Sequence, residues 1–267
     1  MQPSHAQVTS PALASLVGAL PAELPRLALT HQRQRERGVL AVLEQGGEVR
    51  ALGLHRCGLT ALPACIRELT ALERLDVGGN SLAELPPLPP GVRELFVDDN
   101  QLARFPELPP LRLLDANRNR LVEVPPLVDV EFVYVAANRL TTTPVTRGVR
   151  YLNVSDNPLS ALVLDDAALS EVRAESCGLR ELPASIGKLP LLRDLSLRGN
   201  QLTALPAEVA GLRSLRHLDL RGNLLDDLPA ELAELPNLTK LDLRWNPLRR
   251  RPGWLTELAA RGCTVYC

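Results

Sequence analysis

A fifteen-residue pattern recurs along most of the chain, and it constrains the fold more than any other feature. LRDLSLRGNQLTALP begins at Leu192, and LRHLDLRGNLLDDLP begins 23 residues later at Leu215. Both fit the template L-x-x-L-x-L-x-x-N-x-L-x-x-L-P, which fits ten segments spaced by 19 to 23 residues. The ten segments begin at Val49, Leu72, Val92, Leu111, Val130, Val149, Leu169, Leu192, Leu215 and Leu238. Units this short bury their leucines only by stacking on their neighbours, so the sequence predicts a solenoid.

The composition fits such a stack. Apolar residues make up 45% of the chain and aromatic residues only 3%, so leucine, valine and alanine must fill thin, uniform core layers. The formal charge is −1, from 30 basic and 31 acidic residues. No overall field therefore attracts the protein to nucleic acid or to an anionic membrane, and neither is expected as a partner.

The template is similar to that of the leucine-rich-repeat family, and the resemblance covers residues 49–252. It implies an α/β fold: a leucine-rich-repeat solenoid, a right-handed curved superhelix with ten parallel strands on its concave face and a helical N-terminal cap. In each unit the alternating L-x-L is a short strand whose leucines point inward, while the intervening residues point to the concave face. We expect an N-terminal helical cap at 1–48, ten repeats at 49–252 and a C-terminal cap at 253–267.

The ninth template position predicts how each turn is held. It is cysteine in two repeats, at Cys57 and Cys177, and asparagine in the other eight. The asparagines are Asn80, Asn100, Asn119, Asn138, Asn157, Asn200, Asn223 and Asn246. A buried asparagine can both donate to and accept from backbone groups of the turns beside it. We therefore expect an asparagine ladder in which the two cysteines are structural and not reactive.

The two repeat lengths predict two kinds of convex side. In the 23-residue units, Ile66, Ile186, Val209 and Leu232 each precede a leucine by three residues, which is a helical spacing. Short helical turns are expected behind repeats one and seven to nine. The short repeats carry paired prolines, as in LPPLPPGV and FPELPPL, which favour extended backbone, so thin, non-helical backs are expected behind repeats two to five.

The short units resemble the L-P-x-L-P repeats of effector proteins that bacterial pathogens deliver into host cells. The 23-residue units are similar to the typical repeat of many bacterial and eukaryotic proteins. This mixture indicates a bacterial source. Some such effectors join the repeats to a ubiquitin-ligase domain with a catalytic cysteine, but only 15 residues follow Pro252, so no ligase domain is expected.

Both ends of the stack are expected to be covered, because an open solenoid exposes an apolar layer and a strand edge. Residues 27–43 are interpreted as an amphipathic helix that the Gly-Gly pair at 46–47 ends. The apolar stretch 8–20 predicts a capping helix, with a translocation signal as the alternative.

The C-terminal residues predict a helix followed by a strand. Trp254, Leu255 and Leu258 share a helical face, and residues 263–266 resemble one last partial strand. Cys263 and Cys267 are interpreted as a packed side chain and a free thiol, since no histidine partners them.

No motif for catalysis is present in the sequence. It holds no glycine-rich phosphate loop, nucleophile elbow or paired-histidine metal motif. The four histidines, His5, His31, His55 and His217, are too dispersed to share a metal. The five cysteines lack the clustered pairs of secreted leucine-rich domains, which favours a reducing compartment. The expectation is a protein that is not an enzyme and uses no cofactor and no metal.

Scarce aromatic residues gather at outward strand positions. The chain has three Phe and three Tyr, and four of these six fall on the predicted concave side of repeats three to six. Together with one leucine they predict a partner-binding patch of Phe96, Leu113, Phe132, Tyr134 and Tyr151. The alternative is that neighbouring rings only stiffen the sheet through cross-strand packing.

Three arginines occupy the seventh template position of the last repeats: Arg198, Arg221 and Arg244. Asp219 and Asp242 lie beside them and offset their repulsion. A structural ladder and a contact for an anionic partner both remain open. Trp245 favours the partner contact, because exposed tryptophan beside arginine is typical of interface hot spots.

The early repeats carry the opposite charge at their outward positions. Asp76, Asp98, Asp99 and Asp115 predict an acidic surface there, so a bipolar partner would dock in one orientation.

The expected function is that of a non-catalytic, monomeric protein-protein interaction module with a protein partner on its concave face. We expect it in the cytoplasm, or secreted into a host-cell cytoplasm as an effector. One alternative is the substrate-recognition component of a ubiquitin-ligase machine whose catalytic part is on another chain. A generic scaffold is the other.

Overall fold

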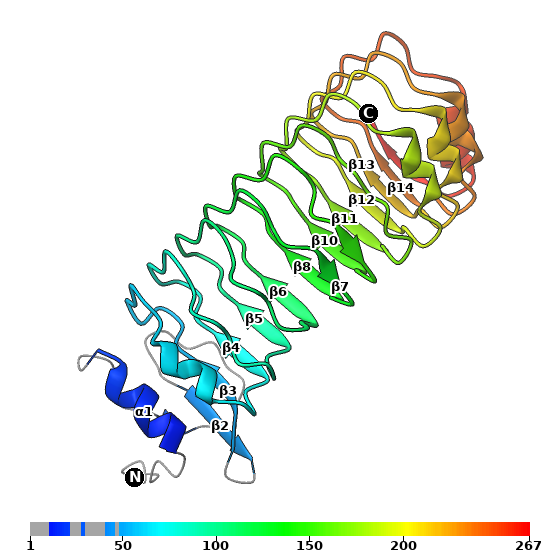
Figure 1. Ribbon diagram of the computed structural model, residues 1–267. Coiled ribbons are helices and arrows are strands. Elements are labelled where there is room, and N and C mark those ends of the chain that lie inside the picture. The colour runs from blue at the N-terminus through cyan, green and yellow to red at the C-terminus, as the bar shows by residue number, and fades with distance from the viewer. Residues whose placement is uncertain (1–10, 22–27, 30–40, 46–47) are drawn as a thin grey trace, which may run out of the picture. The chain divides into compact units, whose positions relative to one another are not determined.

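The computed structural model describes residues 11–21, 28–29, 41–45 and 48–267. The chain forms two compact units, Met1–Pro125 and Pro126–Cys267, whose boundary falls between adjacent prolines in repeat four. Within each unit, successive repeats stack side by side and each contributes a strand to a sheet (Figure 1). The fold is the leucine-rich-repeat solenoid that the template predicts.

Unit 1 contains the first four repeat strands. They are β3 (Glu48–Gly53), β4 (Arg74–Asp76), β5 (Glu94–Phe96) and β6 (Leu113–Asp115), and each pairs in parallel with the next. The register aligns Leu52, Leu75 and Leu95 across neighbouring strands. Because side chains alternate between the two faces of a strand, these leucines are buried in the core and their neighbours face outward.

Unit 2 contains the other six repeat strands and three further strands. The repeat strands are β8 (Phe132–Tyr134), β10 (Tyr151–Asn153), β11 (Glu171–Arg173), β12 (Asp194–Ser196), β13 (His217–Asp219) and β14 (Lys240–Asp242). All of them pair in parallel in chain order. The ten predicted strand positions are therefore confirmed.

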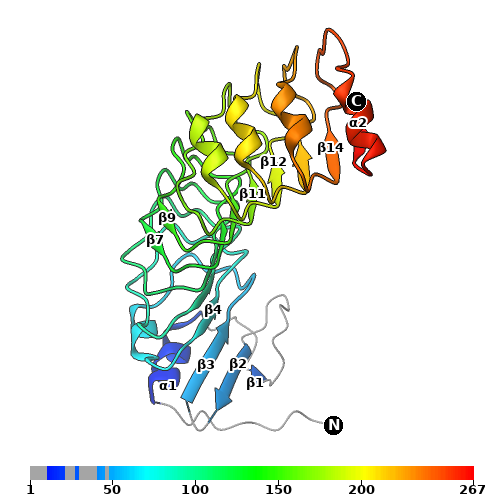
Figure 2. The ribbon, with the colours of Figure 1, turned by 90° about the vertical axis from the view of Figure 1, so that its right-hand side faces the viewer.

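The long repeats have short helices behind their strands, as predicted. Four 3-10 helices, η1 (Ala64–Glu68), η2 (Ala184–Lys188), η3 (Ala207–Gly211) and η4 (Ala230–Glu234), each follow a proline. Each buries the apolar residue singled out by its spacing: Ile66, Ile186, Val209 and Leu232. Figure 2 shows the last three of these helices stacked on the side of unit 2 opposite the strands.

The short repeats have extended backs, which also confirms the prediction. The Pro-Pro segment at 87–90 contains no helix. An unpredicted two-stranded parallel sheet, β7 (Leu127–Val128) and β9 (Thr146–Arg147), joins the backs of repeats four and five. The stacking of two extended backs brings their amides together, so that the Leu127 N–H donates to the Val145 carbonyl (2.9 Å). Thin backs can therefore pair as strands.

The predicted asparagine ladder is present, and Asn157 shows how it works. Its side chain is 1% exposed. The Nδ2 amide donates to the carbonyls of Val135 (3.0 Å) in the preceding repeat and Val154 (2.9 Å) in its own. The Oδ1 atom accepts from the Leu140 N–H (2.9 Å) of the preceding repeat. One side chain thus joins two turns and satisfies backbone groups that no strand partner reaches.

Cys177 supplies only the donor half of this pattern. Its Sγ donates to the carbonyls of Val154 and Glu175, both at 3.3 Å. A thiol has no amide oxygen to accept a hydrogen bond from the preceding turn. In repeat five the Leu140 N–H donates to an asparagine side chain, whereas the equivalent Leu159 N–H of repeat six donates to the backbone carbonyl of Asn157 (2.9 Å). Burial raises the pKa of the Cys177 thiol to about 11, so it stays protonated at neutral pH. These contacts agree with the structural role predicted for Cys177.

The N-terminal end is covered by one helix and two strands. Helix α1 (Pro11–Ala19) packs on η1 with Leu13 and Leu16 buried, as a capping helix requires. Among the described residues, no helix is both long enough and apolar enough to cross a bilayer.

The helix predicted at 27–43 is wrong where the structure describes it. Residues Ala28–Leu29 form β1 and Ala41–Gln45 form β2, while 30–40 lie outside the described residues. Strand β2 pairs antiparallel with β3, from Ala41 opposite Gly53 to Gln45 opposite Glu48. The first repeat strand would otherwise present unpaired N–H and C=O groups, and β2 satisfies them. A Gly-Gly pair between two strand-forming segments is a hairpin signal as well as a helix stop.

The C-terminal residues form the predicted helix and strand. Helix α2 (Trp254–Ala260) buries Leu255 and Leu258, and it lies against η4. Strand β15 (Thr264–Tyr266) pairs in parallel with β14, and Cys263 is packed beneath it.

Every repeat turns through a left-handed residue at template position eight. Three of these residues are glycines, Gly79, Gly199 and Gly222, with φ between 64° and 68°. The other seven are Arg56, Asp99, Arg118, Ala137, Asp156, Ser176 and Trp245, with φ between 52° and 62°. A side chain in this region costs roughly 1–2 kcal/mol relative to the right-handed conformation. The repeat geometry overrides that cost at seven sites.

We predict that Asn157→Ala lowers the free energy of unfolding by about 3 kcal/mol, because three buried backbone groups lose their partner. Urea denaturation followed by circular dichroism measures the change. Asp165→Ala, at an exposed position on the back of the same repeat, is the control and should shift stability by less than about 0.5 kcal/mol. A loss below about 1 kcal/mol for the Asn157 variant would show that the ladder is not needed to hold the turns.

Candidate functional site

The residues at template positions three, five and seven form the open sheet face, which is the face predicted to be concave. Positions four and six point into the core, as Val133 and Val135 do on β8. The core layers are filled without these side chains, and most of them stay partly exposed on the open sheet face. A binding surface is expected on such a face.

Three of the predicted aromatic residues form one group in unit 2, which we call the aromatic group: Phe132, Tyr134 and Tyr151. The parallel register places Phe132 beside Tyr151 on the neighbouring strand. The rings of Tyr134 and Tyr151 lie 4.7 Å apart between centroids, tilted by 34°. All three side chains are half-buried and not fully exposed. Such a ring pair contributes about 0.5–1.5 kcal/mol, so the rings also stabilise the sheet.

An arginine borders the aromatic group. The Arg173 guanidinium lies 6.0 Å from the centre of the Tyr151 ring, on the next strand. Burial raises the pKa of the Tyr151 phenol above its ordinary value, so the hydroxyl stays neutral and can donate a hydrogen bond. The group thus offers apolar ring surface with two hydroxyls at its edge.

The other two members of the predicted patch lie in unit 1. Phe96 is on β5, where the Arg74 guanidinium covers its ring at 4.1 Å from the centre. Arg74 is held there by Glu94, at 2.7 Å. Leu113 is on β6, next to Glu94 in the register. The five residues of the predicted patch are therefore divided between the two units.

A charged groove of about 270 Å³ lies on the open sheet face of unit 2, over β11 to β14. The charged side chains that line it include Glu171, Arg173, Asp194, His217, Asp219 and Lys240. Arg173 donates to Glu171 (3.0 Å), and the ring Nδ1 of His217 contacts the carboxylate of Asp194. Arg173 also borders the aromatic group, so ring surface and groove are continuous. A partner here meets apolar rings followed by charges of both signs.

This groove was not singled out from the sequence, although a signal for it exists. Template position three reads Glu171, Asp194, His217 and Lys240 in four consecutive repeats. Because position three faces outward in each strand, this column of charges could have located the groove.

Two of the predicted arginines are bound by carboxylates. Arg221 donates from Nε to Asp219 (2.9 Å), and Arg244 donates to Asp242 from Nε (2.9 Å) and Nη2 (2.7 Å). Asp242 also lies 3.5 Å from Arg221, so it joins the two repeats. These contacts favour the structural interpretation for both arginines.

Arg198 differs from the other two. Its side chain is exposed, and it forms no ion pair within the part of the chain that the structure describes. Among the three arginines it is the one that leaves its full charge for a partner.

The buried carboxylate of Asp242 is kept ionised by its neighbours. The side chain is almost fully buried, at 2% exposed for the residue, and burial alone would raise its pKa. Hydrogen bonds from Arg244 and the charges of Arg244 and Arg221 outweigh burial and hold the pKa below the usual aspartate range. The charged form is therefore favoured in the folded protein.

The acidic surface predicted for the early repeats is less exposed than expected. Asp76 and Asp98 are only 5% and 7% exposed, and His55 lies 3.7 Å from Asp76. Asp99 is exposed but occupies the turn after β5. The one-orientation docking of a bipolar partner stays a prediction.

Trp245 lies on the turn after β14 and not on a strand. It is 69% exposed, and the Arg244 guanidinium lies 5.6 Å from its ring centre. The same guanidinium lies 5.0 Å from the ring of Tyr266, on β15. Tyr266 was not among the predicted site residues, since nothing in the template places β15 beside Arg244.

Metal-ligating side chains do not gather within the described ranges: no group of three His, Cys, Asp or Glu could hold an ion there. Burial raises the pKa values of Cys57 and Cys263, as it does for Cys177, so these three thiols are poor nucleophiles.

Comparison with known proteins supports the repeat assignment. Residues 190–248 match the family model described as leucine rich repeat. No curated protein gives a significant match to the chain. The structure is similar to YopM from Yersinia enterocolitica, with 30% identity and a TM-score of 0.55, over 76% of this chain and 53% of that protein.

Two further solved structures share the fold. YopM from Yersinia pestis, a leucine-rich effector protein, has 29% identity and a TM-score of 0.58, over 74% of this chain and 61% of that one. The functional domain of InlJ from Listeria monocytogenes has 19% identity and a TM-score of 0.58, over 82% and 53%, which is a likeness of fold alone. The chain thus spans about half to three-fifths of these proteins.

We predict that Asp242→Asn makes the free energy of unfolding fall less steeply as the pH is lowered. Asp242 has a lower pKa folded than unfolded, so the stability it contributes is present above about pH 4 and is lost as pH falls through the folded-state pKa. Urea denaturation between about pH 5 and pH 2.5 should therefore show a shallower loss for the variant than for the wild type. Asp226→Asn, which removes an exposed partner of Arg249, should keep the wild-type slope. Equal slopes for all three proteins would contradict the assignment.

Proposed function

We propose, from the premise that this is a leucine-rich-repeat protein, that it binds a protein partner on the open sheet face and does not catalyse a reaction. The observation that carries the proposal is the aromatic group of unit 2 and its continuity with the charged groove. Tyrosine and arginine are enriched among the residues that dominate binding energy at interfaces. The tyrosines and arginine of this surface lie at outward strand positions, which do not contribute to the core.

The arrangement suits a partner with an apolar segment followed by charged residues. An apolar side chain would cover the rings of Phe132 and Tyr134, and water leaving those half-buried rings would favour binding. Charged groups would then face Arg173, Glu171 and Lys240 in the groove, where wrong charges are penalised. Rings give affinity and charges give specificity in this proposal.

The proposal includes a role as a monomeric effector that acts in a host-cell cytoplasm. The likeness to YopM at 29% and 30% identity supports it, as does the mixture of short and long repeats. Because the chain spans only 53% to 61% of the two YopM structures, further activities of those proteins are not carried over.

Affinity capture with the purified protein as bait, followed by mass spectrometry, identifies the partner. The bait should be compared with the Phe132→Ala, Tyr134→Ala double variant in the same extract. Val145→Ala is the matched control, because Val145 is a 70% exposed apolar residue outside the open sheet face. A partner retained by the wild type and the control but lost by the double variant supports the proposal.

We predict that each ring truncation weakens binding of that partner by more than about 2 kcal/mol, roughly thirtyfold. Each should lower the free energy of unfolding by about 1 kcal/mol, because the rings are half-buried and two of them stack. Calorimetry and urea denaturation measure the two effects. Unchanged binding together with a large loss of stability would assign the rings to sheet stiffening alone.

We also predict that Arg198→Gln changes the association rate severalfold and alters its salt dependence, since Arg198 holds an uncompensated charge. Surface plasmon resonance at several salt concentrations measures both quantities. Arg221→Gln is the matched comparison, and it should have a smaller effect because Asp219 and Asp242 already neutralise Arg221. A larger effect at Arg221 than at Arg198 would reverse this assignment.

A further inference from the structure

Trp245 occupies a position where the fold has no need of tryptophan. It adopts φ 62°, in the left-handed region that bulky side chains avoid. Gly199 and Gly222 make the same turn in the two preceding repeats without that strain. The indole is 69% exposed, so packing does not compensate for it. Six other repeats also place a non-glycine residue in this conformation, so the feature particular to Trp245 is its large exposed indole beside an arginine, which is typical of interface hot spots.

The cation beside Trp245 is held in a fixed position. Two hydrogen bonds to the buried carboxylate of Asp242 orient the Arg244 guanidinium, which lies 5.6 Å from the Trp245 ring and 5.0 Å from the Tyr266 ring. Tyr266 is itself 41% exposed. A ligand therefore meets two exposed rings with a pre-oriented cation, and little side-chain entropy is lost on binding.

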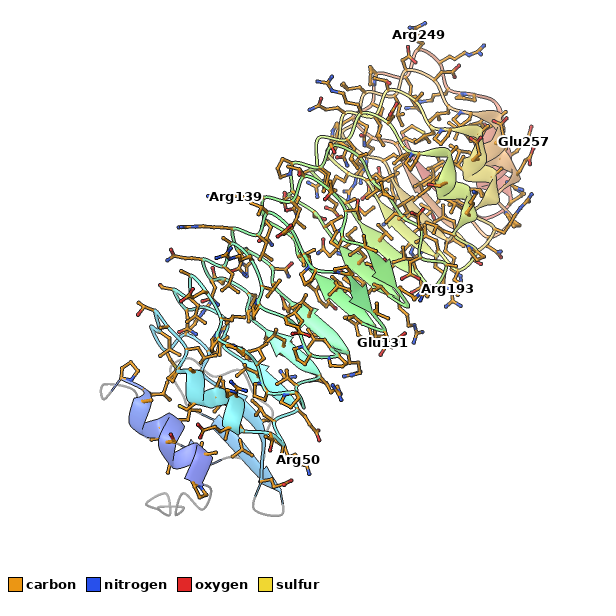
Figure 3. All side chains as sticks on the ribbon, viewed as in Figure 1. Arg50, Glu131, Arg139, Arg193, Arg249 and Glu257 are labelled. Carbon is orange, nitrogen blue, oxygen red and sulfur yellow. The ribbon has the colours of Figure 1, made fainter. Side chains whose placement is uncertain are left out.

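The segment of the sequence that carries these rings is rich in arginine. From Arg244 to the end of the sequence there are five arginines and one glutamate, although the whole chain has a formal charge of −1. The Arg251 Nη2 donates to the Cys267 carbonyl (3.3 Å), next to Tyr266. Arg250 is exposed and forms no ion pair with any residue that the structure describes. The Arg249 side chain lies at the end of unit 2 (Figure 3), where it pairs with Asp226.

We propose that this end of unit 2 is a second docking surface, separate from the aromatic group, for an acidic peptide segment of a partner protein. We call it the terminal surface, and it consists of Arg244, Trp245, Arg250, Arg251 and Tyr266. An apolar side chain of the peptide covers the indole of Trp245, and its carboxylates pair with Arg250 and Arg251. The proposal goes beyond the binding function of the open sheet face.

An acidic peptide fits this surface better than single-stranded nucleic acid does. Bases bind by stacking on successive aromatic faces along a basic path. Here the Arg244 guanidinium lies against both rings, and the two rings do not form a row of stacked faces along a strand-length path. A short peptide needs only one or two cationic contacts and one ring face.

The test is fluorescence anisotropy with a labelled synthetic peptide that alternates glutamate with phenylalanine and leucine. Trp245→Gly should weaken its binding at least tenfold while the melting temperature stays the same or rises, because glycine relieves the turn. Ser176→Gly makes the same change at the same turn position of repeat seven and should leave binding unchanged. Arg250→Glu should weaken binding at least fivefold and reduce its salt dependence.

Two controls separate this surface from others. The Phe132→Ala, Tyr134→Ala double variant should bind the acidic peptide as the wild type does, so failure of the open-face proposal would not affect this result. A peptide with glutamine for glutamate should bind at least tenfold more weakly. The proposal is overturned if Trp245→Gly binds the acidic peptide normally, if it lowers the melting temperature as a structural residue would, or if oligothymidylate binds more tightly than the peptide.

Discussion

The hydrogen bonds of the asparagine at template position nine are the constraint on which the rest of this structure depends. Asn200 shows the full set: its amide donates to the carbonyls of Ala174 and Leu197, and its oxygen accepts from the N–H groups of Cys177 and Leu179. Turns cannot pair their backbone as strands do, and a buried unpaired group costs about 1–3 kcal/mol. Because one side chain satisfies both turns, thin leucine layers stack in register.

Sequence predicted most of the fold because its decisive signals are local. The alternation of L-x-L places each strand, and the position of asparagine or Cys177 in the turn follows from the template. The prediction of a helix at 27–43 failed because the apolar run before Gly46 fits a helix or a strand equally well. Its conformation is decided by the edge of β3, which needs a partner. The β7 and β9 pair likewise depends on repeats stacking, which no single repeat encodes.

For the candidate site, sequence predicted the face of each residue but not its neighbours. Tyr134 and Tyr151 do face outward together, whereas Phe96 is covered by Arg74 from the adjacent strand. The sequence places Asp219 and Asp242 beside Arg221 and Arg244 but leaves open whether these arginines are structural or contact a partner. In the folded protein the carboxylates bind them. Such contacts depend on the direction in which a long side chain extends across the neighbouring strands, and the template does not specify that direction.

The central claim is that a protein partner contacts the aromatic group on the open sheet face. Photo-crosslinking tests it most directly, with benzoylphenylalanine placed at Tyr134 in one protein and at Val145 in another. The claim predicts that the captured partner crosslinks to position 134 and not to position 145. Crosslinks from position 145 alone would contradict it, because that residue lies outside the open sheet face.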